Sequence, residues 1–142
     1  TSDMSTIVDI ADALTAALNA HAFGQAFTAV RRYRPVYELA EMADLHVTVV
    51  PKGVALERAD RSREQVDVRI DVAVQKKVAG EAEVDGLMAL VEEIAAFARD
   101  LRLEECAAVW LRTENDPVYA PEHLAELGVF TSVLTLTLRV VR

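Results

Sequence analysis

The chain has 142 residues, which is about the size of one domain built around a single hydrophobic core. Hydrophobic residues make up 52% of the sequence and charged residues 27%, a composition that excludes a disordered or fibrous protein. The formal net charge of −8 opposes general binding to nucleic acid phosphates, and no apolar run approaches the roughly 18 residues of a membrane-spanning helix.

The first residues stand apart from the rest of the chain. Residues 1–3 precede Met4, which has the character of a natural start, and we interpret them as a cloning remnant. Residues 4–142 are then expected to form a single α+β domain.

The first predicted elements are a helix and a strand. Ser5 or Thr6 can cap a helix whose apolar residues recur at helical spacing as far as about Ala20. Aromatic and β-branched side chains over 27–33 predict a strand, and a short helical turn is expected over 36–42.

Two alternating segments predict the centre of a sheet. Apolar and polar residues alternate over 45–49, before Pro51, and again over ten positions of 66–75, which is the period of a strand. The residues between them, 52–65, are expected to form a loop much longer than the usual hairpin connection of about 2–5 residues. A long loop of this kind in a small domain suggests a functional segment.

The second half of the chain adds a second helix and two more strands. A broad apolar stripe predicts the main amphipathic helix over 84–101, and strands are expected over 107–112 and 130–141, with one or two helical turns over 121–127. The predicted fold is therefore α+β, a mostly antiparallel sheet of about five strands with two main helices packed on one face.

The sequence offers little for nucleophilic or metal chemistry. Cys106 has no cysteine partner and no flanking glycine turn to present it, so a small buried thiol is expected rather than a nucleophile. The three histidines, His21, His46 and His123, are far apart, whereas metal-binding histidines usually occur as close pairs. We expect no metal ion and no cofactor.

Acidic residues provide the remaining candidates for catalysis. Asp67 and Asp71 lie on one face of a predicted strand with Arg69 between them, which allows a carboxylate pair for acid–base or divalent metal chemistry. Their Cα atoms would stand about 13 Å apart at the rise of a strand, too far for one small ion. A solvated face with cross-strand charge pairs is the simpler interpretation. The sequence also lacks a P-loop, a dinucleotide-binding glycine fingerprint and a zinc-protease helix motif, so we expect no enzyme.

Two arginine clusters remain, one near the first strand (Arg31, Arg32, Arg34) and one in the expected loop (Arg58, Arg61, Arg63). Acidic neighbours bring the loop cluster close to neutral, and no aromatic residues alternate with its arginines, so it indicates a protein contact better than nucleic acid binding. An ordinary solvated loop is the alternative.

Taken in order, the segments of this chain resemble the tail terminator and head-to-tail joining proteins of phages with long non-contractile tails and of their prophages. The resemblance covers nearly the whole chain. It rests on the order and character of the following segments: the N-terminal helix, Arg31-Arg32-Tyr33-Arg34-Pro35, Leu45-His46-Val47-Thr48-Val49-Val50-Pro51 before the arginine-bearing loop, Val68-Arg69-Ile70-Asp71-Val72-Ala73-Val74-Gln75-Lys76-Lys77, the helix over 85–94, Asn115-Asp116-Pro117-Val118-Tyr119, and Phe130-Thr131-Ser132-Val133-Leu134.

The resemblance implies a structural protein of the virion tail, assembled in the host cytoplasm. Proteins of this family form a ring, usually a hexamer, that caps the finished tail tube and contacts the head completion or connector proteins. No catalytic residue comes with the resemblance. DNA would pass through such a ring without sequence-specific recognition, and no membrane contact is implied.

The residues expected to build the ring lie in the predicted loop. Subunits that each carry −8 repel one another, so local contacts between opposite charges are needed to offset that repulsion. Arginine guanidiniums form paired hydrogen bonds with carboxylates. We therefore expect Lys52, Arg58, Arg61 and Arg63 to contact an adjacent subunit or the tail tube.

Three other functions stay open at the level of sequence. A head-side connector or tail completion protein belongs to the same class and differs in its partner. A small-molecule-binding regulatory domain would need a concave pocket with convergent polar groups. An enzyme would need a cleft with perturbed titratable groups, for which the candidates are Asp67, Asp71 and His46.

Overall fold

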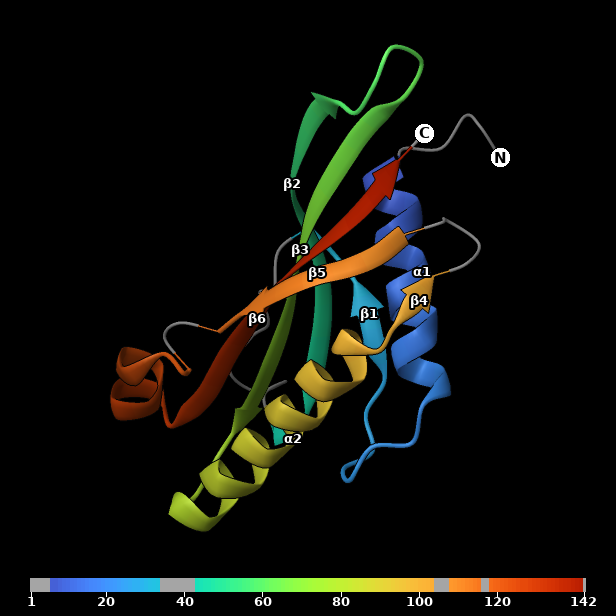
Figure 1. Cartoon of the computed structure of the whole chain (residues 1–142). Coiled ribbons are helices and arrows are strands. Elements are labelled where there is room, and N and C mark those ends of the chain that lie inside the picture. Colours follow the sequence, from blue (N-terminus) through green and yellow to red (C-terminus); the bar gives the residue numbers. More distant parts are fainter. Residues whose placement is uncertain (1–5, 34–42, 104–107, 116–117, 142) are drawn as a thin grey trace.

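The computed structural model describes residues 6–33, 43–103, 108–115 and 118–141 of the chain (Figure 1). Helices and strands follow one another in the order α1 (Thr6–Ala20), β1 (Ala29–Arg31), β2 (His46–Arg58), β3 (Glu64–Lys77), α2 (Glu81–Arg99), β4 (Arg102–Leu103), β5 (Ala108–Glu114), the π-helical turn η3 (His123–Leu127) and β6 (Val129–Val141).

All six strands belong to one sheet, in the order β1-β2-β3-β6-β5-β4. The short β1 runs parallel to β2, and every other neighbouring pair is antiparallel. The predicted α+β class with a mostly antiparallel sheet is thereby confirmed, and the sheet has one strand more than the five expected because the two-residue β4 extends its edge.

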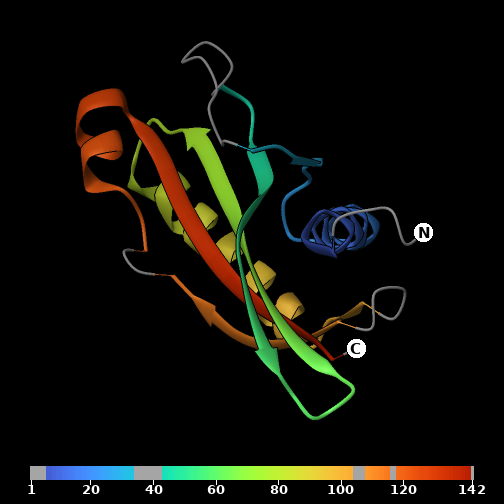
Figure 2. The same ribbon diagram turned by 90° about the horizontal axis from the view of Figure 1, so that it is seen from above.

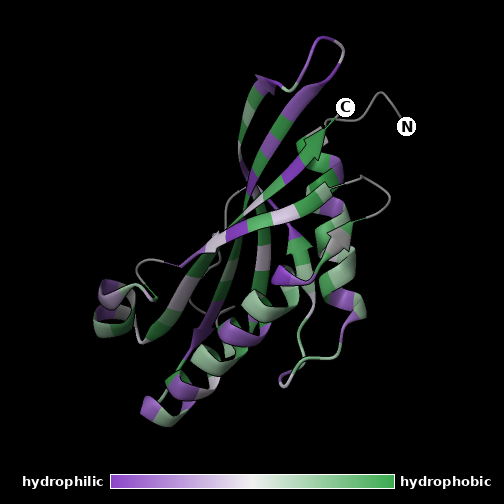
Figure 3. Cartoon of the chain, in the orientation of Figure 1, coloured by the Kyte–Doolittle hydropathy of each residue, from purple (hydrophilic) through white to green (hydrophobic). Residues whose placement is uncertain are grey.

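The core lies between one face of this sheet and both long helices. The even-numbered side chains of β3 from Val66 to Val74 are fully buried, and in the register of the sheet they stand beside the even-numbered residues of β6 from Val140 to Ser132. The apolar stripes of α1 and α2 belong to the same buried cluster, α1 against β1 and β2 and α2 against β5 and β6. Figure 2 shows α1 end-on beside the sheet, and Figure 3 shows apolar and polar residues alternating along the strands. Period-two alternation on the strands and a helical stripe thus identified the core face correctly.

The prediction of a loop over 52–65 is wrong. β2 continues through Pro51 to Arg58, β3 begins at Glu64, and only residues 59–63 connect them. Pro51 is tolerated because β1 pairs with β2 only as far as Val49, and because a register shift follows between Pro51 and Gly53. A proline that lacks an N–H donor is accommodated at such an edge or bulge. The segment that was expected to be a long loop therefore forms most of a long β-hairpin.

Other boundaries also differ from the predictions. The strand expected over 27–33 contains only Ala29–Arg31, α2 begins three residues earlier than expected, and the strand predicted over 107–112 is observed as Ala108–Glu114. The helical turn predicted over 36–42 and the capping residue Ser5 lie outside the described residues, as does Cys106.

Candidate interaction site

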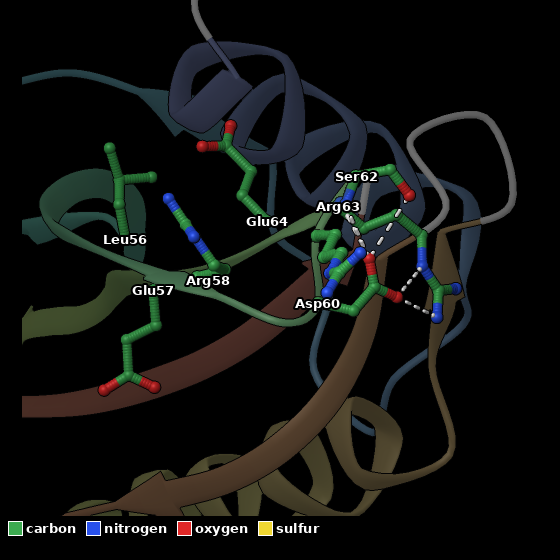
Figure 4. Close-up of a pocket in the computed structure, with 8 residues that line it drawn as sticks. Leu56, Glu57, Arg58, Asp60, Ser62, Arg63 and Glu64 are labelled. Carbon is green, nitrogen blue, oxygen red and sulfur yellow. Dashed lines mark hydrogen bonds and ion pairs between the residues drawn. The ribbon is translucent and has the colours of Figure 1, made fainter.

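The tip of the β2–β3 hairpin is held by one aspartate. The Oδ1 atom of Asp60 accepts hydrogen bonds from the backbone N–H groups of Ser62 (2.9 Å) and Arg63 (3.0 Å), as in an Asx turn. Its Oδ2 atom accepts from Nε of Arg63 at 2.8 Å, as Figure 4 shows. These bonds lower the pKa of Asp60, the bond from the Ser62 backbone contributing most. One of the three predicted interface arginines is therefore engaged by its own turn.

The other two arginines of the tip form no ion pair with any residue that the structure describes. Arg58 and Arg61 are exposed, and Arg58 is the register partner of Glu64 at the start of β3. In Figure 4, Leu56, Arg58 and Glu64 point to one side of the hairpin and Glu57 to the other. Together these residues line a shallow hollow of about 430 Å³ at the tip. Arg58 and Arg61 are thus available for a contact outside the subunit.

Lys52 does not lie with the arginines of the tip. Its Nζ atom stands 3.7 Å from Oδ1 of Asp71, on the face of the sheet opposite the helices. Arg58 lies six positions further along β2, a distance of about 20 Å at the rise of a strand. The structure thus divides the predicted interface residues between the hairpin tip and the open face of the sheet.

The same polar face carries the acidic residues considered for catalysis, each bound to a different partner. Nε and Nη2 of Arg139 donate to the two carboxylate oxygens of Asp67 at 2.7 and 3.0 Å. These bonds lower the pKa of Asp67. Asp71 instead accepts a 2.8 Å hydrogen bond from Oγ1 of Thr135. The two aspartates therefore serve separate cross-strand contacts, as the simpler interpretation expected.

No group of three histidine, cysteine, aspartate or glutamate side chains that could hold a metal ion occurs in the described part of the chain. His46 is half-buried at the start of β2, His21 packs against Phe97 with 4.6 Å between ring centroids, and the side chain of His123 lies outside the description. Among the described side chains, His21 and His46 thus form no metal-binding group with Asp67 or Asp71.

A second shallow hollow, of about 500 Å³, lies where the segment after α1 meets α2. It is lined by His21, Phe23, Glu93, Ala96, Phe97, Asp100 and Leu101. The Glu93 carboxylate is already used there, since Oε1 accepts a 3.0 Å hydrogen bond from the backbone N–H of Gly24. This hollow is mainly a boundary where the segment after α1 packs against α2.

Sequence reasoning missed two exposed apolar side chains on the hairpin. Val54 is 48% exposed and Leu56 60% exposed, on the part of β2 that β1 does not cover. Both stand on the helix-side face, because their register partners Val68 and Val66 are buried in the core. The alternation in Gly53-Val54-Ala55-Leu56-Glu57 is the sequence signal that indicates this strand.

None of the helices among the described residues has the length and apolar character needed to cross a membrane. No family model matches the chain. No curated protein matches it either. Among solved structures it is similar to a chain from the virion of a native gene transfer agent (GTA) particle, with a TM-score of 0.43 and 18% identity over 91% of this chain and 84% of that chain. At this TM-score the likeness is coarse and fixes no function for this chain.

Proposed function

We propose that this protein is a virion assembly protein, a tail terminator that forms a ring on the end of a phage or prophage tail tube and joins it to the head. The observation that carries the proposal is the β2–β3 hairpin. Its tip projects past the ends of β6 and α1 in Figure 1, and it presents Arg58 and Arg61 beside the exposed Leu56. Exposed apolar and cationic groups on one projecting arm suit a contact between protein subunits.

A structural role also agrees with the chemistry of the acidic residues. Asp67 is held by Arg139 and Asp71 by Thr135, so neither carboxylate is placed to exchange a proton with a bound substrate. We propose accordingly that the protein is not an enzyme and works without a cofactor.

The proposed partners are further copies of the same chain, the tail tube protein and a head completion or connector protein. The ring is proposed to be a hexamer in the virion tail. Arg58 and Arg61 would bind carboxylates of an adjacent subunit or of the tube, and the apolar side chains would supply most of the affinity.

The test is a charge reversal at the hairpin tip. Arg58→Glu with Arg61→Glu in one chain should leave the subunit folded, because both side chains are exposed. This variant should lose the ability to cap purified tail tubes, seen in electron micrographs as tails of uncontrolled length. The matched control reverses two exposed cations far from the tip, Lys77→Glu with Arg99→Glu, and should cap tails as the natural chain does.

Normal capping by the Arg58 and Arg61 double variant would contradict the proposal that the tip forms the contact. A head-side connector would give a different result, since it would co-purify with the portal rather than with the tube. A protein that binds neither tubes nor portals would overturn the proposed function as a whole.

A further inference from the structure

The sheet has two long edges that its outermost strands leave largely open. β1 pairs with β2 only at Val47–Val49, and β4 pairs with β5 only at Ala108 and Val109. Among the residues that the structure describes, no strand pairs with β2 from Lys52 to Arg58 on that side, or with β5 from Trp110 to Glu114. Unpaired strand edges expose rows of N–H and C=O groups that can bind another strand.

The open edge of β2 lacks the usual protection against such pairing. From Val54 to Arg58 it is extended and exposed, and two of its five side chains are large and apolar. Proteins usually shield an edge of this kind with prolines or inward-pointing charges, and here both Pro51 and Lys52 stand before the segment. An exposed apolar edge in a folded chain indicates a surface that is covered in an assembly.

The directions of the two edges are complementary. β2 is antiparallel to β3, β3 to β6 and β6 to β5, so β2 and β5 run in opposite directions. Rotation about an axis close to the strand direction keeps the strands of two copies in the same sense, so it brings β5 of the second copy antiparallel to β2 of the first. Pairing Glu57 with Arg112 staggers neighbouring copies by four residues, because Glu57 lies level with Val141 and Arg112 with Thr137. The strands must therefore be tilted to the ring axis, as they are in a closed barrel.

The side chains of the two edges match in one register. With Glu57 opposite Arg112, both on the polar face, Leu56 stands opposite Thr113 on the helix side and Ala55 opposite Glu114 on the polar face. Opposite charges directly across an antiparallel pair stabilise it. The polar face is thus continued across the boundary, and on the helix side Leu56 meets Thr113 while Arg58 stands opposite Leu111 at the end of the segment.

We propose that the β2 edge of one subunit, Ala55–Arg58, pairs with the β5 edge of the next, Leu111–Glu114, so that a ring of copies shares one continuous sheet. This inference rests on the proposed ring and names the contact that closes it. The contact joins two different surfaces, so it excludes a two-fold dimer and generates a ring where the rotation between copies closes.

Cysteine cross-linking tests the contact directly. Ala55→Cys and Glu114→Cys are introduced together in a chain whose Cys106 is replaced by Ser. Within one subunit, β3 and β6 separate the strands of the two positions by about 14 Å, and the register offsets the positions by four further residues along the strands, whereas a disulfide needs Cα atoms within about 7 Å. Any disulfide between them must therefore join two copies. Oxidation, with and without tail tubes, should convert the monomer band on a non-reducing gel into a ladder that ends at the ring size.

The controls separate this contact from other arrangements. Each single cysteine variant should stay monomeric on the gel, as should Ala55→Cys combined with Glu92→Cys on the exposed side of α2. Dimers from Ala55→Cys alone would show β2 pairing with β2 and overturn the proposal. Rings that are visible by electron microscopy but give no ladder would also overturn it, while leaving the proposed function intact. Protein that stays monomeric by light scattering, both alone and with tubes, would instead refute the ring itself.

A charge exchange gives a second readout that does not depend on thiols. Glu57→Arg and Arg112→Glu should each weaken ring formation by about fivefold per contact, and the two together should restore it. Failure of the double variant to recover would argue against this register.

Discussion

At the scale of single residues, the Asp67–Arg139 pair links β3 and β6 on the polar face and makes stability depend on pH. The hydrogen bonds from Arg139 lower the pKa of the Asp67 carboxyl. Its stabilising contribution is therefore fully present above the ordinary pKa of about 3.9, and it is lost as the pH falls through the lowered value in the folded state.

We predict that Asp67→Asn lowers the free energy of unfolding by about 1 kcal/mol at neutral pH, a modest value because Arg139 is 35% exposed. The difference from the natural chain should begin to shrink below about pH 4 and disappear as the pH falls through the lowered pKa of the folded state, where the natural carboxyl is protonated as well. Urea unfolding at several pH values measures it. Glu92→Gln, at an exposed carboxylate of α2, should show little difference at any pH, and a constant difference for Asp67→Asn would refute the role of the charge.

At the scale of elements, the entry into β6 depends on one glycine. Gly128 follows η3 with a φ of +64°, which side chains other than glycine rarely adopt. Its N–H donates to the carbonyl of Leu124, and its own carbonyl accepts from the N–H of Val78 at the end of β3. This single residue therefore reverses the chain so that β6 can run back beside β3.

We predict that Gly128→Ala lowers the free energy of unfolding by about 1–2 kcal/mol, measured by urea denaturation. Strain in the backbone causes this loss, because the nearest atom to an added Cβ, the carbonyl oxygen of Val78, would lie at 3.8 Å without a clash. Gly80→Ala is the matched control, since Gly80 has extended backbone and nothing within 4 Å of an added Cβ. An equal loss at both positions would show that the left-handed conformation is not the cause.

At the scale of the whole molecule, a net charge of −8 opposes association while Arg58 and Arg61 favour it locally. We predict that the rate of ring formation by the natural chain exceeds that of the Arg58→Glu, Arg61→Glu variant most at low salt. The ratio of the two rates should fall toward one as salt rises, because the screening length shortens from about 10 Å at 0.1 M to 3 Å at 1 M.

Stopped-flow light scattering measures this ratio. Finished rings should dissociate little over the same range of salt concentrations, because salt does not screen the buried apolar contacts between subunits. A ratio that does not change with salt would mean that the arginines act through packing rather than through charge.

The sequence by itself determined the fold class and the buried surface. Alternation from Val66 to Val74 and along 130–140, with the stripe of α2, reports which side chains avoid water, because the period of each element fixes which residues share a face. The lack of familiar catalytic and metal motifs is likewise a property of residue types and their spacing in the sequence.

Only the tertiary structure decided how these faces are used. β2 can continue beyond Pro51 only because β1 does not pair with it there, on the edge away from β3. The sequence does not show how far β1 extends along that edge. Asp67 finds Arg139 72 residues away through the register of the sheet, and Arg63 turns back to Asp60 instead of reaching outward. Periodicity is a local property of the chain, whereas strand neighbours, free edges and charge partners depend on how the whole sheet is packed. The open edges of β2 and β5, on which the proposed ring depends, therefore became visible only in three dimensions.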